Sequence, residues 1–131
     1  AEWARTPWLV LLEDDVRVDG PITRMPDGID AGGVEDHRWT APLKPALLEE
    51  IRRRTGAAPS YKHYGLCGGA IVRTSALRDT PTLDDTMPAG ELGKLRAMDD
   101  RVGLWNDVTL ATLLLLGGHT VEPWADVKQG K

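Results

Sequence analysis

The stretch Trp-Leu-Val-Leu-Leu-Glu-Asp-Asp, residues 8–15, decides the predicted fold class of this chain. It begins with five consecutive apolar residues, Trp8 to Leu12. A short, uninterrupted apolar run is typical of a strand that is buried on both faces inside a parallel sheet. The stretch therefore predicts a buried strand near the start of the sequence, followed at once by acidic side chains.

Three adjacent carboxylates, Glu13, Asp14 and Asp15, follow this strand. Adjacent acids repel one another, and near a core they also lose hydration. A hard cation such as Mg²⁺ or Mn²⁺ would offset both costs, because these ions prefer oxygen ligands and often bind carboxylates together with substrate phosphates. The alternative is a polar strand end that opens into solvent. Ligands of open α/β sheets collect beyond the carboxyl ends of strands, which favours the metal site.

The composition indicates one domain, which we expect to span residues 1–131. A net charge of −4 offers no basic field for nucleic acid. The single cysteine, Cys67, excludes an internal disulfide and a cysteine zinc cluster, in agreement with a reducing, cytoplasmic location. The longest apolar run near the C-terminus, residues 110–116, is too short to span a bilayer, so no membrane span is expected.

Helices and strands are predicted to alternate along the chain. Residues 20–41, rich in proline and glycine, predict an irregular surface stretch. Apolar residues recur at helical spacing over residues 43–54, and Gly56 is placed to end that helix. The remaining predicted elements are a strand over 66–73, a helix over 91–98, an apolar helix over 107–116 and a strand over 119–122. This order predicts an α/β fold with three layers and a mostly parallel sheet.

Asn106 and Asp107 form a second candidate site at the start of the last predicted helix. Asn106 is predicted to cap the helix, and a carboxylate at the next position gains about 0.3–1 kcal/mol from the positive helix end. Capping alone would account for both residues. The functional alternative makes Asp107 a general base that points into a cleft.

A third candidate is the glycine pair Gly68 and Gly69, inside the predicted strand 66–73. Glycines in a strand often mark close approach by a ligand or by another backbone. The spacing is not that of a phosphate-binding loop, because no Gly-Lys-Ser/Thr follows. Close packing of a helix on the sheet is the alternative.

Together these features resemble a glycosyltransferase of the GT-A fold. The resemblance rests on the Asp-x-Asp-like triple 13–15 after an apolar strand, the glycine-rich strand 65–72 and the acidic position 106–107 at a helix start. A Leu-Gly-Gly turn into a short strand, residues 116–121, completes it. The succession covers nearly the whole chain.

The resemblance implies a metal site and a donor site. Asp15 would be the direct ligand of Mn²⁺ or Mg²⁺, with Asp14 as a second or water-mediated partner. Glu13 would face the ribose or the donor sugar, and the cation would bridge the diphosphate of a nucleotide-sugar. Gly68 and Gly69 would line the donor-sugar pocket.

The resemblance also implies an inverting reaction, in which Asp107 would be the catalytic base that deprotonates the hydroxyl of an unknown acceptor. Members of the family usually begin with a nucleotide-binding βαβ unit, whereas only twelve residues precede Glu13 here. We therefore expect the C-terminal catalytic part of a GT-A domain, with most of the nucleotide-binding half missing or supplied by a partner chain. The late histidine that usually binds the metal has no clear counterpart.

Two other classes of protein are alternatives to the transferase. A receiver domain of a response regulator also has acidic residues after its first strand, but it needs a later phospho-acceptor aspartate, and no Asp lies between residues 37 and 78. The second alternative is a non-catalytic remnant of the fold that binds a sugar or a partner protein.

Overall fold

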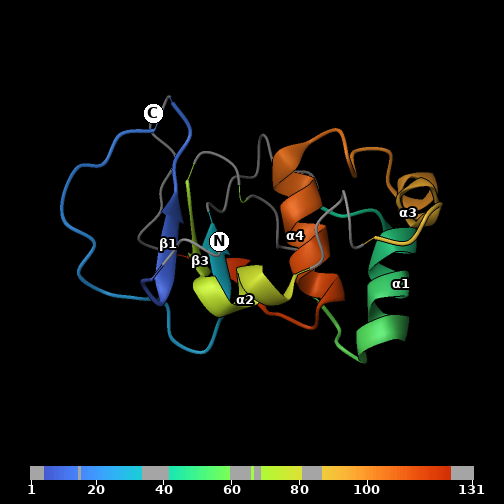
Figure 1. The fold of residues 1–131 in the computed structure, drawn as a ribbon, viewed down its shortest axis with the longest axis horizontal. Coiled ribbons are helices and arrows are strands. Elements are labelled where there is room, and N and C mark those ends of the chain that lie inside the picture. The colour runs from blue at the N-terminus through green and yellow to red at the C-terminus, as the bar shows by residue number, and fades with distance from the viewer. Residues whose placement is uncertain are drawn as a thin grey trace.

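A computed structural model describes residues 5–14, 16–33, 42–59, 66, 69–80 and 87–124. The chain has an α/β fold, as predicted (Figure 1). Its elements, in chain order, are β1 (Trp8–Leu11), β2 (Ala31–Gly33), α1 (Pro45–Thr55), β3 (Ala70–Arg73), α2 (Thr74–Asp79), α3 (Glu91–Met98), α4 (Asn106–Leu116) and β4 (Val121–Pro123).

The four strands form a mixed sheet in the order β1-β3-β2-β4. Strand β3 is antiparallel to both β1 and β2, and among the described strands only β2 and β4 pair in parallel. The predicted mostly parallel sheet is therefore wrong. The difference arises because a short strand, β2, forms inside the stretch that was predicted to be irregular, and β3 then inserts between β1 and β2 in the opposite direction.

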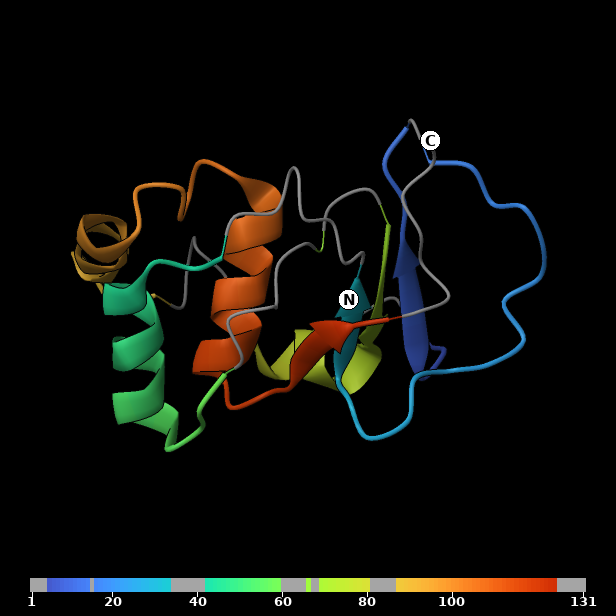
Figure 2. The same ribbon diagram turned by 180° about the vertical axis from the view of Figure 1, so that it is seen from behind.

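One face of the sheet carries the main hydrophobic core. The register brings Val72, Ala31 and Val121 side by side, and all three belong to the main core cluster. Helices α1, α3 and α4 gather on one side of the sheet (Figures 1 and 2). The helices contribute fully buried leucine and isoleucine side chains, including Leu47, Ile51, Leu95 and Leu114.

The other face of the sheet is covered differently. Val10, Ile71 and Gly32 are in register, and Ile71 is fully buried although it lies outside the main core cluster. An irregular segment, residues 16–24, runs over this side of β1 in place of a helix (Figure 2). Among the described residues, the predicted third layer is therefore a loop.

The position of β1 corrects the prediction of a strand buried on both faces. Strand β1 forms as expected, but it lies at an edge of the sheet that the described residues make. Val10 is 41% exposed, and Leu12, just beyond the strand, is 53% exposed. One face of the apolar run is covered by the loop 16–24 instead of by a helix. For this reason an edge strand has the continuous apolar sequence that is usually found in central strands.

The helices follow the sequence prediction closely. Gly56 ends α1 in the left-handed conformation, at a φ of 71°, and donates its backbone N–H to the Arg52 carbonyl at 2.8 Å. Helix α4 begins at Asn106, and no side-chain hydrogen bond caps it, so the predicted Asn106 cap is wrong. In the part of the chain that the structure describes, no helix has the length and apolar character needed to cross a bilayer.

Candidate functional site

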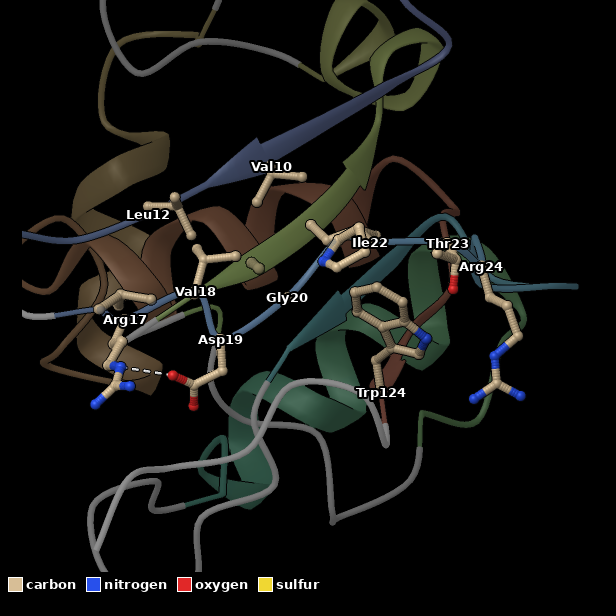
Figure 3. Close-up of a pocket in the computed structure, with 14 residues that line it drawn as sticks. Val10, Leu12, Arg17, Val18, Asp19, Gly20, Ile22, Thr23, Arg24 and Trp124 are labelled. Atoms are coloured by element: carbon tan, nitrogen blue, oxygen red, sulfur yellow. Dashed lines mark ion pairs between the residues drawn. The ribbon is translucent and has the colours of Figure 1, made fainter.

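A cavity of about 440 Å³ opens on the second face of the sheet, beside the carboxyl end of β1. Val10 and Leu12 form one side of it, and Gly69 and Ala70 contribute from the start of β3. Residues 16–24 and Trp124 form the remaining wall (Figure 3). The volume lies within the range of small-molecule sites, which are commonly about 300–1,000 Å³.

Two carboxylates of the acidic triple come next in the chain after the cavity residue Leu12, but neither lines the cavity. Glu13 and Asp14 follow Leu12 directly, and both are exposed. The chain turns there, because the Glu13 carbonyl accepts the backbone N–H of Val16 at 3.1 Å. Asp15 lies outside the described residues, and no group of three or more potential metal-binding side chains is found among those that are described. Carboxylate oxygens are nevertheless the donors that Mn²⁺ and Mg²⁺ prefer.

The glycine-rich stretch meets the acidic triple at the same end of the sheet. Leu11 pairs with Ala70, so Gly69 lies beside the chain as it leaves β1. Gly69 is buried and has a φ of 149°, a conformation that other residues rarely adopt. Gly68 is outside the described part of the chain. Because Gly69 lies close to the end of β1, it lines the cavity together with Leu12.

Asp107 is not among the residues that line the cavity. It is the second residue of α4 and is half-buried, and helix α4 lies on the opposite side of β3 from β1 (Figures 1 and 2). Its charge acts on Arg101, whose pKa it helps to raise after the larger effect of Asp99. The start of α4 and the end of β1 do lie at the same end of the molecule (Figure 1).

A buried ion pair holds the turn that leads to Asp107. The carboxylate of Asp99 is fully buried and accepts hydrogen bonds from Arg101 Nε at 2.9 Å and Nη2 at 2.7 Å. Burial alone would raise the pKa of Asp99, but these bonds and the backbone N–H groups of Lys44 and Arg101 hold it below its usual value. Arg101 also donates to the Pro42 carbonyl at 2.6 Å. The pair thereby fixes the approach to α4.

A second polar cluster lies at the opposite end of the sheet. Asp30 precedes β2, accepts the backbone N–H of Thr120 at 3.1 Å and pairs with Arg73 at 3.2 Å. His119 Nδ1 lies 3.5 Å from the same carboxylate. Burial would raise the pKa of Asp30, yet these partners lower it. Since the cluster joins β2, β3 and β4 far along the strands from the acidic triple, its role is to hold the sheet.

Sequence reasoning missed Trp124, the aromatic side chain in the cavity wall. It also missed the ion pair of Asp99 and Arg101. The available signals were a tryptophan just past a short strand and an acidic pair followed by arginine ahead of a helix. Comparisons with protein-family models, with curated proteins and with solved structures gave no match to this chain.

Proposed function

We propose that this chain is the catalytic segment of a metal-dependent glycosyltransferase of the GT-A type. It would move a sugar from a nucleotide-diphosphate sugar to an acceptor hydroxyl, with inversion. The observation that carries the proposal is the cavity that Leu12 and Gly69 help to line, with the exposed Glu13 and Asp14 directly after Leu12 in the chain. Two candidate motifs that are far apart in the sequence meet there.

The acidic triple supplies the donor chemistry that a divalent cation needs. Asp15 would bind Mn²⁺ or Mg²⁺ directly, Asp14 would act beside it or through water, and Glu13 would face the ribose or the donor sugar. The cation would supply Lewis-acid stabilisation of the diphosphate leaving group. Both described carboxylates are exposed, so a metal–diphosphate complex could reach them without displacing buried groups.

The glycine pair and Asp107 have separate roles in this proposal. Gly68 and Gly69 would line the donor-sugar pocket, where a side chain would collide with the substrate. Asp107 would act as the base for the acceptor hydroxyl, from the start of a helix that the Asp99–Arg101 pair holds in place. The acceptor would then lie across the upper end of the sheet, between β1 and α4 (Figure 1).

The nucleotide-binding half is proposed to come from a further segment or from a partner chain. The position of β1 at an edge of the sheet that the described residues make supports this idea. Edge strands leave backbone donors and acceptors that another strand can pair.

The test is calorimetry with Mn²⁺ and a panel of nucleotide-sugars, followed by a transfer assay. We expect nucleotide-sugar binding that needs both the metal and Asp15. Asp15→Ala and Asp107→Ala should each abolish transfer, and the exposed Glu49→Ala should leave it unchanged. Transfer retained in both aspartate variants would exclude the proposed mechanism.

A non-catalytic sugar-binding protein is the second candidate. It is favoured by one observation: the residues that line the cavity include Asp19 and Trp124 but neither Glu13 nor Asp14. Sugar binding that does not depend on metal would support this candidate, and the same calorimetric titration without Mn²⁺ would reveal it.

A further inference from the structure

We propose that Trp124 is the stacking platform for a pyranose ring in the cavity beside β1. The proposal deepens the proposed transferase function. It rests on that function only in identifying the bound sugar as the sugar of the donor. The stacking itself requires only the cavity. No sequence motif pointed to this residue.

Trp124 lies where two cavities meet. It lines the 440 Å³ cavity and also a second one of about 350 Å³, which Met25, Asp27 and Glu122 help to form. Its indole lies across the first cavity from Val10 and Leu12 (Figure 3). A half-buried aromatic ring between two open volumes presents a face that a ligand can cover.

The sheet itself fixes the position of Trp124. Its backbone N–H donates to the Gly33 carbonyl at 2.9 Å, which extends the parallel pairing of β2 and β4 by one bond. The side chain then crosses Gly32, where an added Cβ would lie only 2.7 Å from the Cβ of Trp124. Gly32 therefore gives the tryptophan room to lie against the sheet, and the ring is held by a rigid element.

The other walls of the cavity offer apolar contacts for the C–H face of a sugar and polar groups for its hydroxyls. A pyranose has a face of C–H groups, which the electron-rich face of indole attracts, and a rim of hydroxyls. Apolar contacts are available from Val10, Leu12 and Val18. Arg17 and Asp19 form an exposed ion pair at 2.5 Å in the same wall, and such a pair offers both donors and acceptors to neighbouring hydroxyls (Figure 3).

The experiment is saturation-transfer NMR with four probes: the methyl pyranosides of glucose, galactose, mannose and N-acetylglucosamine. We expect at least one probe to bind. Trp124→Leu should weaken that binding about tenfold, as expected for loss of an aromatic contact, while Trp124→Phe should largely retain it. Glu49→Ala, an exposed change on α1 that is not among the residues lining the cavity, should bind the probe as the unaltered protein does.

A second variant tests the same cavity in case Trp124→Leu does not fold. Asp19 has a side chain that is 75% exposed, so Asp19→Ala should fold normally and still weaken binding of the same probe. Absence of binding by all four probes, or equal binding by the protein and both variants, would overturn the proposal. Metal-dependent binding of nucleotide-sugar that persists in Trp124→Leu would leave the transferase function standing and remove only the stacking role.

Discussion

Arg101 holds the fully buried carboxylate of Asp99 through two parallel hydrogen bonds, from Nε at 2.9 Å and from Nη2 at 2.7 Å. The arginine side chain is itself only 11% exposed. Removal of one partner from such a pair leaves the other charge buried and unpaired, which is more costly than loss of the pair as a whole. The stability of the turn before α4 therefore depends on both residues together.

The first prediction concerns this pair. Asp99→Ala should lower the free energy of unfolding by about 3–5 kcal/mol, because Arg101 would lose its counter-charge inside the protein. Urea denaturation followed by circular dichroism measures the change. Asp100→Ala is the matched control, since Asp100 pairs with Lys44 on the surface and should cost no more than about 1 kcal/mol. Equal losses in the two variants would contradict the buried-pair account.

The second prediction is that the stability of the folded protein decreases at low pH. The pKa values of Asp99 and Asp30 are both lowered from 3.8 in the folded protein, despite the opposing effect of burial. A lowered carboxyl pKa means that the stabilisation is complete above the unfolded value and is lost as pH falls through the folded one. The urea midpoint should therefore fall steadily below about pH 4.

The acid dependence can be assigned with one variant. In Asp99→Asn the fall of the urea midpoint between pH 5 and pH 2 should be smaller, because one of the two carboxylates no longer takes up a proton. Midpoints measured at intervals of one pH unit test this. A fall as steep as in the unaltered protein would show that Asp99 does not contribute.

The third prediction compares two glycines. Gly32→Ala should destabilise the protein, because the new Cβ would lie 2.7 Å from the Cβ of Trp124, and it should also change tryptophan fluorescence. Gly93→Ala is the control within helix α3, where an added Cβ meets nothing within 4 Å. That substitution should stabilise by about 0.5–1 kcal/mol. Two substitutions of the same type are thus expected to have opposite signs.

The fourth prediction tests the metal role of Asp14. Mn²⁺ should bind weakly by itself and more tightly with UDP present, because the diphosphate completes the coordination of the ion. If Asp14 acts through water, Asp14→Asn should weaken Mn²⁺ binding in the presence of UDP by about 10–100-fold. The affinity for Mn²⁺ is measured by titration followed by electron paramagnetic resonance, and Glu49→Gln, at an exposed residue, is the control. Unchanged affinity in Asp14→Asn would remove that residue from the site.

The helices were predictable from the sequence because their signals are local. Helix α1 carries an apolar face that includes Leu47 and Ile51, and Gly56 ends it in the left-handed conformation that glycine favours. Strand β2 was not predictable, since Ala-Gly-Gly has no β-branched side chain. Its strand character comes from pairing with β3 and β4, which lie far along the chain.

The candidate site was predictable only in part for the same reason. Gly69, which lines the cavity, was predicted because the glycine pair interrupts an apolar run, whereas the acidic triple stays a prediction from the apolar run that it follows. Strand direction is a tertiary property, so the sequence did not reveal that β3 runs antiparallel to β1. The place of Trp124 depends on the space above Gly32, a relationship between residues 92 positions apart (124 minus 32).

The loop that replaces a helix layer over β1 has an evolutionary consequence. Among the described residues, those at positions 16–24 line the cavity and do not belong to the main core cluster. Loops tolerate substitutions and insertions better than the elements that they connect. Under the proposed function, the sugar selectivity of the cavity can therefore diverge between descendants of this protein through changes in one surface segment, while the packing of the helices stays the same.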